Sequence, residues 1–353
     1  MKKKKTIKIN KKTLARNLLL ALVVIALAIV VPQAVKGVVN KGKTEDDSKT
    51  APTYIDLSQY PSLCEFLREK NIDTEKVISV SVLPKNISSN RAVYGGVLYF
   101  KAVVKYAEGE TEKEFTSENG ISFMDTGGLD LPNAEAVMMS AEGEHSIKLK
   151  FFDYETAFNV NISRQVVTNE KERLINKYAR VSEDYTAGNI TTSYDVNFVY
   201  GTDDEVSQME EEALGALAEM LNAASDAGYT IYALSGYRSY ELQTYLYERA
   251  GGDAQSTTAP PGGSEHQSGL AMDMTWGDNY YSLYEDQENT SEYDWLTANC
   301  ANYGFVLRYT KGYEDITGYI YEPWHFRYLG KDMAKEYYNS GAHTLEEFMA
   351  EPR

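Results

Sequence analysis

The sequence is poor in the residues on which small secreted scaffolds and fibrous proteins depend. It has two cysteines, Cys64 and Cys300, and nine prolines in 353 residues. Two cysteines cannot build a disulfide framework or a zinc cluster held by thiolates. Hydrophobic residues make up 43% and charged residues 25% of the chain, a globular composition that excludes wholesale disorder, collagen and coiled coil. The length favours about two domains.

Basic residues are also scarce, and their distribution is uneven. The chain carries 35 Lys and Arg against 52 Asp and Glu, a net charge of −17. Because binding to phosphates needs a basic surface, we expect no nucleic-acid partner. Residues 1–35 hold eight basic residues and no acid, so the rest of the chain has 27 basic against 52 acidic residues. The basic N-terminal run therefore stands apart from an acidic protein.

Residues 18–31, directly after this basic run, are fourteen uninterrupted apolar residues. A basic flank followed by an apolar stretch is typical of a signal sequence. The Val-Pro-Gln-Ala-Val that follows, at residues 31–35, matches a cleavage site poorly, and the basic end fits the cytoplasmic side. We predict a cytoplasmic segment over 1–17 and a single-pass transmembrane signal-anchor over 18–35, with a cleaved signal peptide as the alternative. Both interpretations place the remaining residues outside the cytoplasm.

The composition beyond the apolar run predicts a linker and two folded regions. Residues 36–53 are polar and charged, with Gly37, Gly42 and Pro52, and favour a linker. Residues 54–167 contain short runs rich in Val, Ile, Tyr, Phe and Thr, separated by glycine turns. This spacing predicts a small all-β, antiparallel sandwich-like domain.

Helix and strand signals alternate irregularly over residues 169–350. Thr202 with Glu205 has the pattern of a capping box, and apolar residues then recur at helical spacing until Gly228. Strands are predicted at Leu270–Trp276, Phe305–Tyr309 and Trp324–Tyr328. Because the βαβ alternation is not strict, we predict an α+β domain rather than a doubly wound one.

Two of the four histidines lie in dense polar segments of this region. His266 and Asp273 share the segment 264–273, and His325 lies in the segment Glu-Pro-Trp-His-Phe-Arg-Tyr. A catalytic zinc uses three nitrogen or oxygen ligands and leaves one position open. His266, Asp273 and His325 could supply that set. Taken singly, a histidine such as His266 or His325 is more often a surface or hydrogen-bonded core residue, Asp273 could be a turn or cap residue, and HExxH is absent.

Two further charged residues complete the candidate chemistry. Glu322 precedes His325 by three residues, with Pro323 stiffening the link. A zinc ion lowers the pKa of a bound water to about 7, and a nearby carboxylate can take its proton. Arg238 follows a strand predicted at Tyr229–Ser235 and offers a planar fork for a substrate carboxylate. A structural salt bridge is the alternative for Arg238 in so acidic a chain.

Together these segments resemble the VanY-type D-alanyl-D-alanine carboxypeptidases. The family pattern SxHxxGxAxD stands at residues 264–273, ExxH at 322–325 and SGYRS at 235–239. A Tyr-Gly-Phe-x-x-Arg-Tyr stretch at 303–309 and a Leu-Glu-Glu tail at 345–347 also match. The resemblance covers about residues 169–349 and implies the hedgehog/D-Ala-D-Ala peptidase-like fold, a central antiparallel sheet flanked by helices.

The resemblance also assigns roles to individual residues. It implies that His266, Asp273 and His325 bind Zn²⁺ and that Glu322 is the general base. It implies that Arg238, Gln243 and Ser264 contact the peptide terminus or the developing oxyanion, and that Trp324 lines the site.

We therefore predict an anchored, extracytoplasmic zinc carboxypeptidase of a Gram-positive bacterium. Its expected reaction is removal of the C-terminal D-alanine from peptidoglycan stem peptides. The alternatives are an L,D-carboxypeptidase on tetrapeptide stems, a peptidoglycan endopeptidase and a non-catalytic cell-wall binding protein.

Overall fold

The computed structural model describes residues 54–108, 110–254, 257–278 and 280–352. The segments predicted at 1–17, 18–35 and 36–53 lie outside the described residues. Within the described ranges, none of the helices combines the length and the apolar character that a membrane crossing requires. Cys64 and Cys300 are both buried and not joined to each other.

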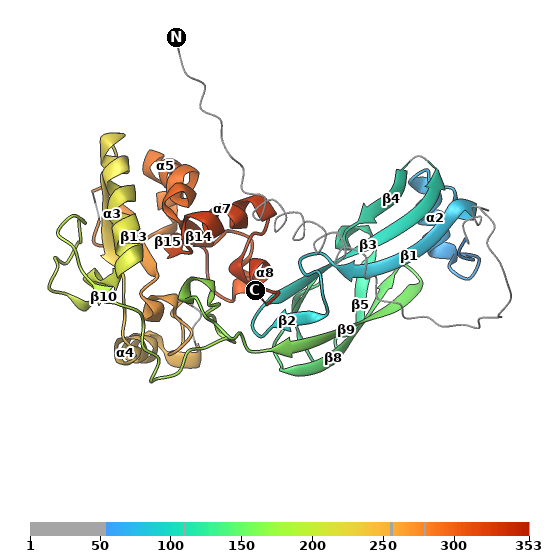
Figure 1. The fold of residues 1–353 in the computed structure, drawn as a ribbon, viewed down its shortest axis with the longest axis horizontal. Coiled ribbons are helices and arrows are strands. Elements are labelled where there is room, and N and C mark those ends of the chain that lie inside the picture. Colours follow the sequence, from blue (N-terminus) through green and yellow to red (C-terminus); the bar gives the residue numbers. More distant parts are fainter. Residues whose placement is uncertain (1–53, 109, 255–256, 279, 353) are drawn as a thin grey trace, which may run out of the picture. The chain divides into compact units, whose positions relative to one another are not determined.

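The N-terminal half of the described chain forms two β-sheets around one core (blue to green in Figure 1). One sheet has the order β1-β3-β7-β6 with β4 paired to β3, and the other has the order β2-β9-β8-β5. The strands are β1 (Val77–Pro84), β2 (Arg91–Val93), β3 (Val97–Glu108), β4 (Glu110–Phe115), β5 (Ile121–Asp125), β6 (Asp130–Asn133), β7 (Ala136–Met138), β8 (Gly143–Phe151) and β9 (Tyr154–Ser163). A short helix, α2 (Pro61–Glu69), adds Leu63, Phe66 and Leu67 to the same core.

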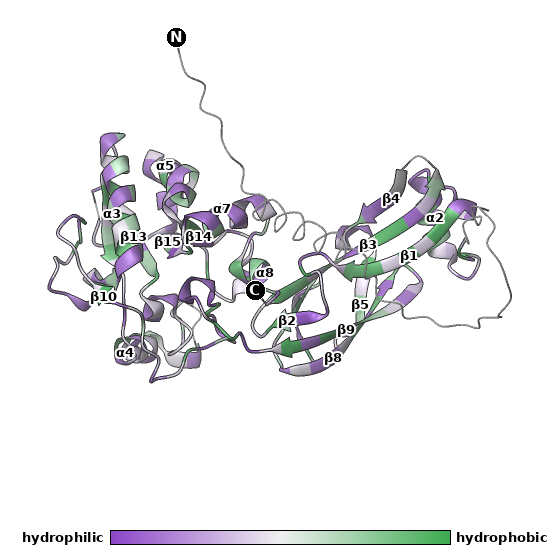
Figure 2. Cartoon of the chain, viewed as in Figure 1, coloured by the Kyte–Doolittle hydropathy of each residue, from purple (hydrophilic) through white to green (hydrophobic). Residues whose placement is uncertain are grey.

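The alternating sequence of β8 and β9 explains why these strands form a half-buried sheet. Ile147, Leu149 and Phe151 point into the core, while the residues between them are exposed, and Figure 2 shows this alternation along β8 and β9. A period of two places every second side chain on one face. The sandwich-like arrangement agrees with the prediction, except that β2 pairs with β9 in parallel. A chain segment of crossover length between these two strands permits the parallel pairing.

The C-terminal half is built on one four-stranded antiparallel sheet of order β12-β13-β15-β14 (Figure 1). Its strands are β12 (Ile231–Ser235), β13 (Ala271–Trp276), β14 (Phe305–Tyr309) and β15 (Glu322–Tyr328). The helices are α3 (Glu211–Asp226), α4 (Tyr240–Ala250), α5 (Ser291–Asn299), α6 (Glu314–Thr317), α7 (Lys331–Ser340) and α8 (Leu345–Phe348). The mixed α+β class with an antiparallel sheet is thus confirmed for this part of the chain.

The start of α3 differs from the predicted capping box. Residues 205–207 form a short 3₁₀ helix capped by Asp204, and the helix proper begins only at Glu211. Between them Met209 and Glu210 form β11, which pairs with β10 (Ile190–Thr191). Helical spacing of apolar residues cannot reveal this strand pairing, because its partner lies outside the periodic segment. The predicted end is correct: Gly228 follows the helix with φ +91°.

The segment after α7 packs against the core of the N-terminal β-rich region as well as against the C-terminal region. The Val93 N–H donates to the Ala350 carbonyl at 2.7 Å, and Ala350 belongs to the core of the β-rich region. The Asn86 side chain donates to the Glu347 carbonyl at 2.9 Å. The predicted limits of 54–167 and 169–350 for the two domains therefore remain predictions, since residues near 350 contribute to both cores.

Candidate metal centre

The three predicted metal ligands converge at the middle of the second sheet. Asp273 on β13 and His325 on β15 are direct cross-strand partners, so their side chains share one sheet face. His266 lies on a 3₁₀ turn, Glu265–Ser268, that leads into β13. His266 Nε2 is 3.3 Å from Asp273 Oδ2, and His325 Nδ1 is 3.1 Å from Asp273 Oδ1. All three side chains are almost fully buried.

Gly269 makes this convergence possible. It ends the 3₁₀ turn with φ +70°, a conformation that favours glycine. A Cβ at this position would lie 2.3 Å from Ile190 Cδ1 and 3.0 Å from the Glu210 backbone nitrogen. The chain can therefore reverse between His266 and the start of β13 at Ala271.

The hydrogen bond of His266 and the unpartnered atoms beside it show that the site fits a cation. His266 Nδ1 is 2.7 Å from the Gly236 carbonyl, so Nδ1 carries the proton and Nε2 presents a lone pair to Asp273. His266 Nε2 and Asp273 Oδ1 are buried with no hydrogen-bond partner. Facing lone pairs repel each other unless a positive charge lies between them. Two imidazoles and one carboxylate are a donor set that catalytic zinc uses.

Electrostatics support the same conclusion. Burial, followed by the charge of Arg238, lowers the pKa of His266 to about 4, which keeps its Nε2 free of a proton. Burial opposes protonation of His325, but contacts with Asp273, Glu265 and Glu322 raise its pKa well above the ordinary value. The carboxylates around His325 thus stabilise positive charge at this point, and a bound divalent cation would supply that charge.

All eight predicted site residues line one cavity of about 180 Å³. Its lining residues are Arg238, Gln243, Thr257, Thr258, Ala259, Ser264, His266, Asp273, Leu283, Tyr309, Tyr319, Glu322, Trp324 and His325. A larger cavity of about 580 Å³ beside α7 contains no histidine in its lining, so size does not identify the site.

Glu322 and Arg238 line the same cavity, and each lies close to one of the three candidate ligands. Glu322 Oε2 is 3.4 Å from His325 Nδ1, and its side chain is 14% exposed. Burial raises the pKa of Glu322, which makes its carboxylate a better proton acceptor. Arg238 follows β12, its Nη2 is 3.9 Å from Asp273 Oδ2, and its Nε is buried without a partner. Arg238 therefore has a free donor for an incoming anion.

The remaining predicted contacts are placed as follows. Gln243, on α4, donates to the Ala259 carbonyl at 2.7 Å, while its buried Oε1 has no partner. Ser264 precedes the 3₁₀ turn and is buried, and Trp324 lies beside His325 on β15. The structure brings all three residues to the cavity, and their roles toward a substrate remain predictions.

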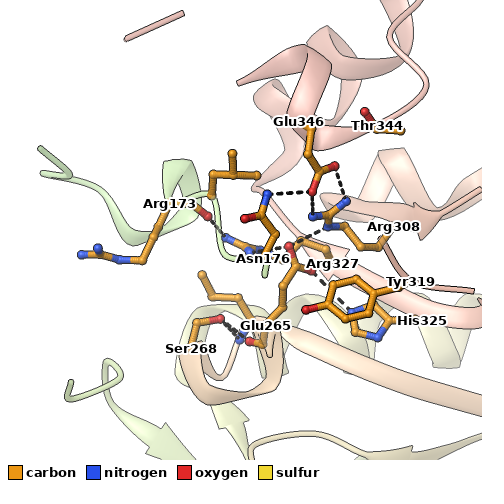
Figure 3. A network of polar contacts seen from close by, with 12 residues as sticks. Arg173, Asn176, Glu265, Ser268, Arg308, Tyr319, His325, Arg327, Thr344 and Glu346 are labelled. Carbon is orange, nitrogen blue, oxygen red and sulfur yellow. Dashed lines mark hydrogen bonds and ion pairs between the residues drawn. The ribbon is translucent and has the colours of Figure 1, made fainter. Parts of the chain in front are cut away.

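The sequence argument missed a buried ionic network behind the metal centre (Figure 3). Glu265 pairs with Arg308 and Arg327, and Arg308 pairs with Glu346. Burial opposes ionisation of Glu265, but the two arginines lower its pKa below the ordinary value. Arginines inside the apolar strands Phe-Val-Leu-Arg-Tyr and Trp-His-Phe-Arg-Tyr were a signal for this network, because charged residues are rarely buried unpaired.

Comparisons with known proteins agree with these motifs. A family model for VanY, D-alanyl-D-alanine carboxypeptidase, matches residues 206–331, a range that contains all eight predicted site residues. The chain is 38% identical over 180 residues to "Putative carboxypeptidase YodJ" of Bacillus subtilis (strain 168), covering 50% of this chain and 65% of that protein.

Two further similarities come from an enterococcal protein and a solved structure. The chain is 34% identical over 152 residues to the bifunctional D-Ala-D-Ala dipeptidase and D-Ala-D-Ala carboxypeptidase VanXYC of Enterococcus gallinarum, covering 37% of this chain and 77% of that protein. It is 36% identical to the solved LdcB LD-carboxypeptidase, with a TM-score of 0.49, covering 53% of this chain and 90% of that one.

Proposed function

The chain belongs to the VanY family of D-alanyl-D-alanine carboxypeptidases, and on this premise we propose that it is a zinc metallopeptidase that removes the C-terminal D-alanine from peptidoglycan stem peptides. One observation carries the proposal. His266, Asp273 and His325 converge within 4.8 Å of one another, in a cavity that also contains Glu322 and Arg238. A ligand set, a base and an anion clamp in one small cavity are the parts that hydrolysis of a terminal peptide bond requires.

His266, Asp273 and His325 would hold the metal ion in this mechanism. A bound zinc ion supplies Lewis acidity toward the scissile carbonyl and activates water at neutral pH. His266 is fixed in the ligating tautomer by the Gly236 carbonyl, which accepts its Nδ1 proton at 2.7 Å. Asp273 would contribute an oxygen, from a position that the cross-strand pair with His325 holds in place.

Glu322 would move the protons of the reaction. Its carboxylate takes a proton from the attacking water and returns it to the leaving amine, so no net charge accumulates on the protein. The burial of Glu322 raises its pKa, which brings its proton affinity closer to the neutral range in which both transfers occur. Glu322 shares one cavity with His325 and Asp273, which supports a role beside the reacting carbonyl.

Arg238 would select substrates that end in a free carboxylate. It is the single Lys or Arg among the described residues that line the cavity. A guanidinium binds a carboxylate through two parallel hydrogen bonds, and the free Nε of Arg238 is available for one of them. This clamp favours a carboxypeptidase over an endopeptidase, whose substrate has no chain end at that position.

We also propose that the chain acts outside the cytoplasm, anchored by residues 18–35, with the β-rich region as a spacer or wall-contacting module. The basic flank and the apolar run support the anchor. Protease added to intact cells should digest the folded region, and protection of that region would contradict the assignment. Unchanged wall association after loss of residues 54–167 would count against a wall-contacting role.

The substrate is tested by incubating the full-length protein with muropeptides that carry tri-, tetra- and pentapeptide stems. The proposal predicts that pentapeptide loses one alanine in mass spectra and that a chelator blocks the loss. Consumption of tetrapeptide instead would assign an L,D-carboxypeptidase. Cleavage within cross-linked stems would assign an endopeptidase, and intact stems throughout would leave only a binding protein.

A further inference from the structure

Four charged side chains lie completely buried behind the metal centre (Figure 3). Glu265, Arg308, Arg327 and Glu346 each have an exposed fraction of 0%. Desolvating charges is costly unless each is paired and hydrogen-bonded. These residues come from four segments: the 3₁₀ turn before β13, then β14, β15 and α8. Apolar side chains could fill the same space at lower cost, so the cluster points to a role other than packing.

Arg308 is the centre of the cluster and bridges its two carboxylates. Its Nη1 and Nη2 donate to Glu346 at 2.9 and 2.7 Å, a bidentate pair. Its Nε donates to Glu265 Oε1 at 2.7 Å. The Arg327 Nη1 is 3.1 Å from the same Glu265 oxygen. Two cations and two anions balance, so the cluster is neutral and holds Glu265 by one oxygen only.

The other oxygen of Glu265 faces a metal ligand. Glu265 Oε2 is 3.4 Å from His325 Nε2, and among the described residues neither of these two buried atoms has a hydrogen-bond partner. The opposite ring nitrogen, His325 Nδ1, faces Asp273 at 3.1 Å. The imidazole thus lies between the anionic network on one side and the ligand set on the other.

We propose that Glu346, Arg308 and Glu265 form a positioning relay that orients the imidazole of His325. Glu265 accepts the Nε2 proton, so that Nδ1 carries the lone pair directed toward Asp273. Arg308 fixes the plane of Glu265, and Glu346 fixes Arg308 through both of its oxygens. The proposal rests on the zinc site of the proposed function and adds residues that touch neither metal nor substrate.

The relay gives a physical role to two sequence motifs that the reaction itself does not use. Arg308 is the arginine of the Tyr-Gly-Phe-x-x-Arg-Tyr stretch, and Glu346 belongs to the Leu-Glu-Glu tail. The backbone of β15 fixes the Cα of His325 but leaves its ring rotation open. A carboxylate on the distal nitrogen sets that rotation and the tautomer, and loss of such partners commonly costs 10–100-fold in metal affinity.

The alternative is that the network only fastens α8 to the sheet. Two neighbouring carboxylates on α8 distinguish the cases. Glu346 binds Arg308, whereas Glu347, also buried, accepts the His343 N–H at 3.0 Å. Glu346→Gln and Glu347→Gln each remove one buried charge from the same helix. A fastening role predicts that Glu346→Gln loses stability and that neither variant changes the metal site selectively.

The experiment measures zinc affinity of the full-length protein by competition with a chromogenic chelator, and the visible spectrum of the Co²⁺-loaded form. We expect Glu346→Gln to weaken zinc binding about 10-fold and Glu265→Gln by about 10–100-fold. Both should alter the Co²⁺ spectrum, whereas Glu347→Gln should match wild type. Glu346→Asp, which keeps the charge, should recover part of the affinity.

Equal zinc affinity and equal Co²⁺ spectra for Glu346→Gln and Glu347→Gln would overturn the relay while leaving the proposed function intact. If Glu265→Gln does not fold, the comparison of the two α8 variants still decides. Absence of zinc binding by the wild-type chain would overturn both the relay and the proposed zinc mechanism.

Discussion

Replacing Glu322 by Gln tests the assignment of the base, because the amide keeps the volume of the side chain but cannot accept a proton. Glu322 lies 3.4 Å from His325 Nδ1 and is outside the proposed ligand set, so zinc should remain bound. A positioned general base contributes about 10²–10⁴-fold to the rate. We therefore expect kcat for D-alanine release from a pentapeptide to fall by that factor, about 3–5 kcal/mol in activation free energy.

The pH dependence of kcat/KM is a second test of the role of Glu322. Burial raises the pKa of Glu322, and the residue acts as a base only when ionised. The kcat/KM of the wild-type protein should therefore fall as the pH drops through that raised pKa, and Glu322→Gln should lack this acidic limb. Glu219→Gln is the control, since Glu219 makes an exposed ion pair with Lys331. Activity of Glu322→Gln within tenfold of wild type, at equal zinc content, would refute the role of Glu322.

Three other perturbations have defined outcomes. Arg238→Met should lower kcat/KM at least about 30-fold for substrates with a free C-terminal carboxylate, a loss of about 2–5 kcal/mol, because the buried charge pair between Arg238 and the substrate carboxylate is lost. An equal effect on amidated substrates would contradict the clamp. Gly269→Ala should destabilise folding by at least about 1–2 kcal/mol in denaturant titrations, since φ is +70° and Glu210 N lies 3.0 Å from the new Cβ; unchanged stability would contradict the tight turn. Removing zinc with a chelator should lower the free energy of unfolding by about 4 kcal/mol, compared with the protein in free zinc at 1,000 times its Kd. The Tm should fall and added zinc should restore it. A Tm that does not change with chelator would argue against a metal in the fold.

Sequence reasoning located the cavity residues because the metal-ligating and acidic residue types stand in recognisable motifs, at 264–273 and at 322–325. Asp273 and His325 were found on separate predicted strands, and antiparallel pairing makes them direct partners. Predicted bounds of β14 agree residue for residue with the structure, because Gly304 punctuates its start. What sequence could not supply was the pairing of β13 with β15, since register depends on side chains far apart in the chain.

The buried network was invisible for a related reason. Glu265 stands between Ser264 and His266, where a single charged residue reads as a solvated side chain. Its partners Arg308 and Arg327 come from strands that lie beyond α5 in the chain. Spacing along a sequence does not reveal which carboxylate meets which guanidinium, because that depends on how strands from distant segments assemble. The misplaced start of α3 has the same cause.

The most direct test of the account is a crystal structure of the zinc-loaded protein with anomalous data at the zinc edge. We predict one zinc ion bound by His266 Nε2, His325 Nδ1 and an Asp273 oxygen, at about 2.0–2.2 Å from each. Glu322 should lie next to the open coordination position and outside the ligand set. Zinc at another position, or a ligand set without His325, would contradict the central claim.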